Sequence, residues 1–405
     1  MRVLFANDYP HIPENTGGTE INTHELCLAL RETGHQPAVL AALVGRGWVG
    51  TAARVRLRLP WHSGWAEDRG LGYCVLRAWS PGDALDAAIT KLRPDVVIVQ
   101  SWRPDMVAIA LRRGCGVALY SHSAHSALAD TIGGDWMRRC VLLANSEFNA
   151  RFQGDALGAA FDVLHPLVRQ ERYLADGPRN VVLQVGISAR KGAALTVAIA
   201  QARPDIGFTM VRSWEGLRAP PEDMAIETAA RAQPNIRVVP PERDPRRLYG
   251  TAKIMLVPSL WAETWGRVVT EAQANGIPVV ASNRGGLPES VGEGGITLGP
   301  EADAGVWAAA VGRLWDDPVW HTEMSARARR RVRREDIAYA PLRDRFLAIL
   351  ERAHRLRDTA HGVQSCDRPT RIRPRRNSKV TSPAASESPT STGNAPSTDN
   401  DRCHR

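Results

Sequence analysis

A regular alternation of short apolar runs with helix-like segments constrains the fold of this chain more than any other feature. The second half contains the apolar runs 180–186, 206–213, 235–240, 252–259 and 277–282, and the first half repeats the pattern with the runs 2–7, 36–43, 95–101, 116–122 and 140–145. Apolar strands alternating with helices are typical of parallel sheets covered on both faces. The pattern predicts an α/β fold with two Rossmann-like domains that face a cleft and meet near residues 163–173. In such sheets, ligands bind at the carboxyl ends of the strands.

The length of 405 residues and the 43% content of hydrophobic residues suffice for about two domains. We expect an N-terminal domain over 1–165, a second domain over 166–335, and a C-terminal helix over 336–358 that packs back on the first domain. Residues 359–405 are rich in Pro, Ser and Thr and nearly free of large apolar residues, which predicts a disordered basic tail. Residues 45–78 have a weak pattern and predict an irregular insertion with one short strand.

The formal charge of +9 is concentrated near the C-terminus. Residues 321–357 carry a net +6 and the tail carries +4, so the remaining chain is close to neutral. A uniformly basic nucleic-acid-binding protein would not have this distribution, although the C-terminal region could meet a polyanion or a membrane surface.

The six cysteines are scattered, without a CxxC pair or a Cys/His cluster, so reduced thiols are expected and a disulfide framework or structural zinc is not. The chain opens on a strand and lacks an apolar run of about 20 residues. These features predict a cytoplasmic protein, and peripheral contact with the inner face of a membrane through the basic C-terminal region is a further hypothesis.

The stretch 259–286 contains two carboxylates, Glu263 and Glu271, eight positions apart. An apolar stripe predicts a helix that begins around 264–266, and Gly266 would let an anion approach the free amides at its N-terminus. Arg267 could add a positive charge. On spacing alone, a surface helix with a solvated glutamate is the favoured interpretation.

Together with the following GIPVVASNRGG, this stretch resembles the donor-site motif of retaining, GT-B-fold glycosyltransferases of family 4 (glycosyl transferases group 1). The resemblance covers about residues 1–357 and is strongest over 256–295. It implies that Glu263 contacts the donor sugar, that the turn Thr264, Trp265, Gly266 and Arg267 binds the diphosphate, and that Glu271 holds the ribose.

Three other places are similar to the family pattern. Gly17 and Gly18 match a glycine-rich loop near the donor, although a plain helix-entry turn explains them equally well. VGISARKG supplies Lys191 against the diphosphate, but Ile187 replaces the family arginine, for which Arg190 is the candidate substitute. Taken alone, a lysine after a strand is more often a solvated charge.

The third place is the end of the run 116–122. His122 matches a family histidine that points at the reacting sugar, with His125 as the alternative, whereas a lone histidine at a strand end is usually structural. Trp48, Trp61, Trp65 and Trp79 could stack on an acceptor, but local packing is the favoured interpretation.

The resemblance implies a hexosyltransferase-like enzyme that moves a sugar, with retention, from a nucleotide diphosphate-sugar to an acceptor hydroxyl on a glycan, a lipid-linked molecule or a small molecule. It implies no cofactor and no obligatory metal. Two alternatives remain open at this point. One is a weak or inactive GT-B protein that acts as a binding module, which Ile187 favours. The other, less favoured, is a nucleic-acid-binding protein that uses the Arg-rich C-terminal region.

Overall fold

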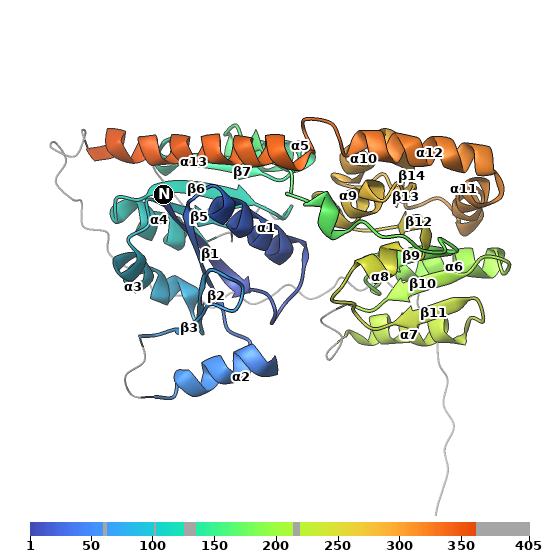
Figure 1. Ribbon diagram of the computed structural model, residues 1–405, viewed down its shortest axis with the longest axis horizontal. Coiled ribbons are helices and arrows are strands. Elements are labelled where there is room, and N and C mark those ends of the chain that lie inside the picture. The colour runs from blue at the N-terminus through green and yellow to red at the C-terminus, as the bar shows by residue number, and fades with distance from the viewer. Residues whose placement is uncertain (60–62, 101–102, 125–134, 214–218, 362–405) are drawn as a thin grey trace, which may run out of the picture. The chain divides into compact units, whose positions relative to one another are not determined.

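The computed structural model describes residues 1–59, 63–100, 103–124, 135–213 and 219–361. Helices and strands in these ranges build two β-sheets, each with helices packed on its faces (Figure 1). From residue 362 onward, the predicted disordered tail lies outside the described residues. No helix in the described ranges is both long and apolar enough to cross a membrane.

The first sheet has eight strands in the order β3-β4-β2-β1-β5-β6-β7-β8. All neighbours are parallel except β3 and β4. Leu4 of β1 is paired with Ala38 of β2 on one side and Val97 of β5 on the other, so the strand order reverses at β1. The strands are β1 (Arg2–Pro10), β2 (Gln36–Ala42), β3 (Ala66–Asp68), β4 (Cys74–Ala78), β5 (Val96–Val99), β6 (Gly116–Ser121), β7 (Cys140–Ala144) and β8 (Asp162–Val163).

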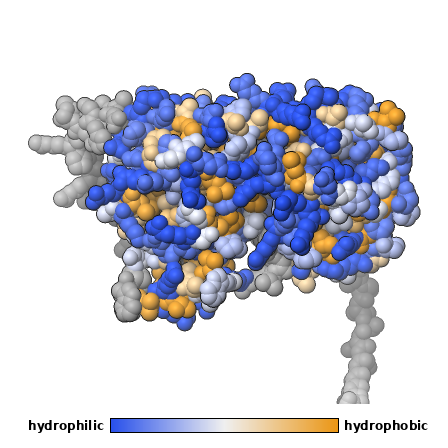
Figure 2. Space-filling model, viewed as in Figure 1, coloured by the Kyte–Doolittle hydropathy of each residue, from blue (hydrophilic) through white to orange (hydrophobic). Residues whose placement is uncertain are grey.

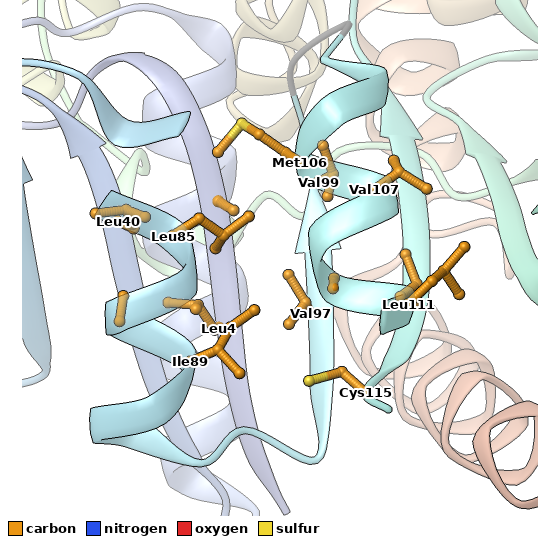
Figure 3. Close-up of a cluster of buried hydrophobic side chains, with 14 of the residues drawn as sticks. Leu4, Leu40, Leu85, Ile89, Val97, Val99, Met106, Val107, Leu111 and Cys115 are labelled. Atoms are coloured by element: carbon orange, nitrogen blue, oxygen red, sulfur yellow. The ribbon is translucent and has the colours of Figure 1, made fainter. Parts of the chain in front are cut away.

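Helices cover both faces of this sheet because its central strands are apolar throughout. Figure 3 shows one face, where apolar side chains of α3 and α4 pack on those of β1, β2 and β5. The helical elements of this half are α1 (Gly18–Glu32), α2 (Gly47–Arg56), α3 (Pro81–Leu92), α4 (Pro104–Arg112), α5 (Glu147–Leu157) and the short 3₁₀ turns η1 (Asp135–Arg139) and η2 (Gln170–Arg172).

The second sheet has six parallel strands in the order β11-β10-β9-β12-β13-β14. Its order reverses between β9 and β12, as in doubly wound nucleotide-binding folds. The elements are β9 (Val181–Val185), α6 (Ala193–Ala202), β10 (Phe208–Val211), α7 (Pro221–Ala232), β11 (Ile236–Val239), α8 (Arg246–Tyr249), β12 (Ala252–Val257), α9 (Arg267–Ala274), β13 (Val279–Ser282), α10 (Leu287–Val291), η3 (Gly292–Gly294), β14 (Gly295–Leu298), α11 (Ala304–Asp316) and α12 (Pro318–Arg331).

The last helix, α13 (Tyr339–His361), returns to the first sheet. Its buried residues Leu342, Phe346 and Leu350 belong to the same apolar cluster as Phe5 of β1. The rings of Phe5 and Phe346 lie 6.4 Å apart between centroids. The residues after the second sheet therefore complete the core of the first.

The segment 45–78 differs from the irregular insertion that the sequence predicted. It contains helix α2 and strands β3 and β4, and β4 is an inner strand of the sheet. Arg77 lies fully buried within β4, where Glu14 (3.2 Å) and Asp68 (2.7 Å) neutralise it. A buried arginine in a strand obscures the apolar pattern, which explains why β4 was not recognised as an inner strand.

Two further expectations can be compared with the structure. Cys27, Cys74, Cys115 and Cys140 are buried and unbonded, as expected for reduced thiols, while Cys366 and Cys403 lie outside the described residues. Among the tryptophans that were assigned to local packing, Trp65 is buried, but Trp48 and Trp79 are exposed, so that assignment was wrong for these two. Trp61 is outside the described residues.

Candidate functional site

Lys191 and Glu263 form an ion pair at the carboxyl end of the second sheet. Lys191 follows β9 and Glu263 follows β12, the two strands between which the order reverses. Lys191 Nζ lies 3.0 Å from Glu263 Oε1, and Ser259 Oγ donates to the same oxygen over 3.1 Å. The Lys191 side chain is 38% exposed, whereas that of Glu263 is 12% exposed. The ammonium group therefore keeps access to solvent and to a ligand.

The electrostatics of Glu263 favour its charged form. Burial opposes ionisation, but the Lys191 charge and the hydrogen bonds from Lys191 and Ser259 outweigh burial, so the pKa of Glu263 lies below its usual range. The carboxylate is thus an acceptor for hydrogen bonds, which suits contact with sugar hydroxyls and not proton donation.

Glycines shape the loop that carries Lys191. Gly186 has φ of +93°, and a Cβ on it would lie 2.9 Å from the Lys191 side chain, which runs across this position. Gly192 has φ of +67°, and a Cβ there would meet the Pro258 carbonyl oxygen at 1.9 Å. Both positions require glycine, so the GxxxxxG spacing in this loop brings Lys191 against the loop that follows β12.

Helix α9 begins at Arg267, after Gly266 with φ of +82°. The predicted start at 264–266 was therefore up to three residues early, and Glu263 lies in a loop and not in the helix. No acceptor among the described residues bonds the backbone amides of Arg267 and Val268. These amides and the positive end of the helix dipole can stabilise an anion close to Glu263.

Arg267 and Glu271 have surroundings quite unlike those of the Lys191–Glu263 pair. Arg267 is 7% exposed, and its guanidinium donates to Glu271 Oε1 (3.2 Å), the Leu167 carbonyl (2.5 Å) and the Tyr173 hydroxyl (3.0 Å). The Tyr249 hydroxyl donates to Glu271 Oε2 over 2.6 Å. The Arg267 guanidinium thus binds the segment between β8 and β9, which joins the two sheets. Each carboxylate oxygen of Glu271 already accepts a hydrogen bond from the protein.

The side chains of Thr264 and Trp265 contact the first half of the chain. Thr264 Oγ1 donates to the His122 carbonyl (2.9 Å) and accepts from Asn145 Nδ2 (2.8 Å). The buried Trp265 ring stacks on His165 with 4.2 Å between centroids. Because both side chains are engaged with the first half of the chain, only the backbone groups of the turn 264–267 remain for a ligand at these two positions.

His122 follows β6, where the sequence placed it. Its Nε2 lies 3.1 Å from Gln100 Nε2. Because the Gln100 amide nitrogen donates here, the ring proton of His122 resides on Nδ1. Burial lowers the pKa of His122 to about 3. The ring is therefore neutral near pH 7 and can donate one hydrogen bond through Nδ1. His125 is outside the described residues.

Gly17 and Gly18 begin helix α1 beside the motif of the second half. Glu20 accepts from the Gly17 amide over 3.0 Å. A Cβ placed on Gly18 would lie 3.8 Å from Arg267 Cδ. The loop after β1 thus reaches the start of α9.

Arg190 and Ile187 show how this chain departs from the family pattern. Ile187 is 5% exposed and packs in the core of the second sheet. The Arg190 guanidinium lies over the Trp261 ring, 4.2 Å from its centroid. Stacking on Trp261, two residues before Glu263, therefore fixes the Arg190 guanidinium. Position 187, where the family has an arginine, is apolar and buried.

Three contributors to this region were missed from the sequence. Gln100 follows β5, Asn145 follows β7 and Tyr249 ends α8. Gln100 and Asn145 each come immediately after an apolar run, at the strand end where ligands bind, so their position could have indicated them as site residues. Tyr249 has no comparable signal, because its contact with Glu271 depends on the packing of α8 against α9.

Two family models match this chain. Residues 16–160 match the family model described as Glycosyltransferase Family 4, and residues 193–317 match the model described as Glycosyl transferases group 1. The D-inositol 3-phosphate glycosyltransferase of Mycobacterium sp. (strain KMS) is 31% identical over 195 residues, which cover 43% of this chain and 44% of that protein. The Kineococcus radiotolerans enzyme of the same name is 43% identical over 93 residues, 21% of each chain. The alignment thus spans less than half the length of these curated relatives.

Solved structures share the fold over most of the chain. A glycosyltransferase from Rickettsia africae ESF-5 has a TM-score of 0.67 at 17% identity, over 87% of this chain and 98% of that one. Anabaena Alr3699/HepE in complex with UDP has a TM-score of 0.66 at 15% identity, over 87% and 100%. The chain therefore belongs to the GT-B-fold glycosyltransferases, with a family 4 N-terminal domain and a glycosyl transferases group 1 C-terminal domain.

Proposed function

We propose that this protein transfers a sugar from a nucleotide diphosphate-sugar to an acceptor hydroxyl, with retention of the anomeric configuration. The observation that carries the proposal is the Lys191–Glu263 pair at the strand-order reversal of the second sheet, with the α9 N-terminus beside it. The Gly17–Gly18 loop, next to the strand-order reversal of the first sheet, faces the same region.

The chemistry requires that negative charge on the departing diphosphate be stabilised. Lys191 uses one donor on Glu263, and two of its three N–H groups remain for phosphate oxygens. The amides of Arg267 and Val268 supply further donors that need no rearrangement when charge develops. Arg190, stacked on Trp261, is a third source of positive charge.

The sugar is held from both domains in this proposal. The ionised Glu263 accepts hydrogen bonds from sugar hydroxyls, and neutral His122 donates through Nδ1. Retention and the roles of these side chains are supported by the family resemblance, and the configuration of the product, read by NMR, tests retention directly.

UDP-sugars are the first donors to test, because related folds have been crystallised in complex with UDP and UDP-glucose. Inositol phosphates are the first acceptors, since the curated relatives are named D-inositol 3-phosphate glycosyltransferases.

A panel of UDP-, GDP- and ADP-sugars, read by thermal shift and by release of the nucleoside diphosphate, tests the proposal. Lys191→Ala and Glu263→Ala should each lower turnover by about a hundredfold or more without unfolding the protein. Lys91→Ala is the matched control, because Lys91 forms a similar pair with Glu67 at 2.8 Å in the other domain. Absence of binding for every donor, or equal activity of all three variants, would refute the proposal.

A donor-binding module that performs no transfer is the second candidate function. The buried Ile187 favours it, because the chain lacks one cation that the family places at the diphosphate. Measurable transfer or donor hydrolysis, abolished by Lys191→Ala, would exclude this alternative.

A further inference from the structure

An exposed surface that is both apolar and basic covers helix α2 and its neighbours. Trp48 is 86% exposed, and Val55 and Trp79 are each 57% exposed. The side chains of Arg54 and Trp79 meet over Gly45, because a Cβ there would lie 3.1 Å from each. Figure 2 shows the hydrophobic colour over α2, at the lower edge of the molecule. We define the α2 surface as Val44, Arg46, Trp48, Arg54, Val55, Arg56, Arg58, Leu59 and Trp79.

The amphipathic pattern of α2 is the reverse of that in an ordinary surface helix. Its buried positions carry the small residues Gly50 and Ala53. Ala53 packs with Leu43 of the domain, and Gly50 lies against Glu14. Its outer face carries Trp48 and Val55, seven residues apart and thus on one side of the helix. Val49 and Leu57 are half-buried, but Trp48 and Val55 face solvent, and large apolar side chains on the outer face are typical of a surface that meets an apolar partner.

Positive charge surrounds this apolar stripe. The α2 surface contains Arg46, Arg54, Arg56 and Arg58, and no acidic residue occurs between positions 44 and 66. None of these four arginines forms an ion pair within the described ranges. The nearest acidic side chain in sequence, Glu67, is already paired with Arg69 and Lys91.

The arginines of the C-terminal region are in a different situation. Seven of the eleven arginines in 321–357 lie within 4.0 Å of a carboxylate, in the pairs Arg327–Glu323, Arg331–Asp336, Arg334–Asp336, Arg343–Asp344, Arg352–Asp162, Arg355–Glu351 and Arg357–Asp95. Four arginines of 321–357 form no ion pair among the described residues, the same number as on the α2 surface. No large apolar side chain of 321–357 is exposed, however, so among these two regions of the described chain only the α2 surface combines unpaired arginine with exposed apolar groups.

We propose that the α2 surface docks on an anionic lipid bilayer. Tryptophan and aliphatic side chains partition into the headgroup boundary, and arginines beside them bind lipid phosphates. A bilayer interface satisfies both parts of the α2 surface at once. A nucleic acid would satisfy the arginines but leave Trp48 and Val55 in water.

The α2 surface is joined to the candidate site through Glu14. This residue lies in the loop that leads to Gly17, and its Oε1 accepts from the amides of Val44 (3.2 Å) and Gly45 (2.9 Å). Docking would thus place the Gly17–Gly18 loop near lipid headgroups. A lipid-borne acceptor is a corollary that rests on the proposed sugar transfer, whereas the docking itself does not.

Cosedimentation of the full chain with vesicles tests the docking without any donor. The chain should bind vesicles of phosphatidylcholine with phosphatidylglycerol and bind pure phosphatidylcholine far more weakly. The triple variant Arg46→Gln/Arg54→Gln/Arg58→Gln should weaken binding about a hundredfold, at roughly fivefold for each arginine. Trp48→Ser should weaken it about tenfold by removing a buried apolar side chain from the interface.

A charge-matched control removes three exposed arginines from the C-terminal region. Arg330→Gln/Arg333→Gln/Arg345→Gln should leave vesicle binding within a few-fold of the unmodified chain, and circular dichroism should show that every variant is folded. Failure of the unmodified chain to bind anionic vesicles overturns the proposal. Loss of binding in the control triple, with normal binding in the α2 variants, overturns it as well and assigns the contact to the C-terminal region.

Discussion

Glu271→Gln separates the roles of the two glutamates that the sequence presents as a pair. Glu271 is the only carboxylate among the described residues that pairs with Arg267, and their side chains are 8% and 6% exposed. Removing the charge leaves a buried guanidinium with the Leu167 carbonyl and the Tyr173 hydroxyl as acceptors. Loss of one partner of a buried ion pair costs about 3–5 kcal/mol. Because two neutral acceptors remain, we expect a loss near the lower end, about 3 kcal/mol.

The measurement is thermal unfolding by calorimetry without ligand. For a domain of this size, about 3 kcal/mol corresponds to a decrease in Tm of roughly 6–12 °C. Glu263→Gln is the comparison, because its partner Lys191 is 38% exposed and remains solvated. Such a pair contributes at most about 1 kcal/mol, so this variant should keep its Tm within about 4 °C and lose transfer activity instead.

A double variant distinguishes an unpaired charge from simple loss of packing. Arg267→Met/Glu271→Gln removes both charges and should recover at least half of the stability that Glu271→Gln loses, since no buried charge is left unpaired. Equal Tm values for Glu271→Gln and Glu263→Gln, or additive losses in the double variant, would refute the assignment of Glu271 to the structural neutralisation of Arg267.

Three other outcomes are expected. The pKa of His122 is lowered to about 3, below its unfolded value, so its contribution to stability is present above pH 6.5 and is lost as the pH falls toward 3. His122→Asn should reduce the slope of unfolding free energy against pH by about 1.4 kcal/mol per unit in that window, as urea titrations would show. Thr264→Val leaves the Asn145 amide without its acceptor and should lower stability by about 1–3 kcal/mol, while Ser, which keeps the hydroxyl, should restore it. Ile187→Arg buries a charge in the core, so it should lower Tm and not raise donor affinity; tighter donor binding at an unchanged Tm would contradict the buried position.

Most of the architecture could be predicted from the sequence because most elements outside 45–78 have a local signal of their own. The apolar runs that end before Gly186 and Ser259 are strands β9 and β12, and their loops carry Lys191 and Glu263. What local patterns cannot show is the contact between residues that lie far apart in the chain. The hydrogen bonds of Thr264 with Asn145 and with the His122 carbonyl join positions more than a hundred residues apart. Neither contact produces a periodic pattern of residues in the sequence.

The environment of Arg267 shows a subtler limit. Its spacing of four residues from Glu271 was visible and is typical of a helix-surface pair. An arginine that follows a glycine at a helix start also suggests a ligand for phosphate. The structure buries the guanidinium because Tyr173, Leu167 and Glu271 together supply its acceptors. Two of these belong to the segment between the sheets, whose path is set by tertiary packing.

Helix α2 was missed because the usual reading of amphipathicity assumes that large apolar residues face inward. In 47–56 the small residues Gly50 and Ala53 face inward, while Trp48 and Val55 face outward beside arginines. A search for an apolar stripe with polar residues opposite therefore finds no regular signal in this segment. The same reversal is what an interfacial helix requires, because its second apolar environment lies outside the protein. The outward position of Trp48 and Val55 thus both hides α2 from a sequence search and supports the proposal that this helix docks on a bilayer.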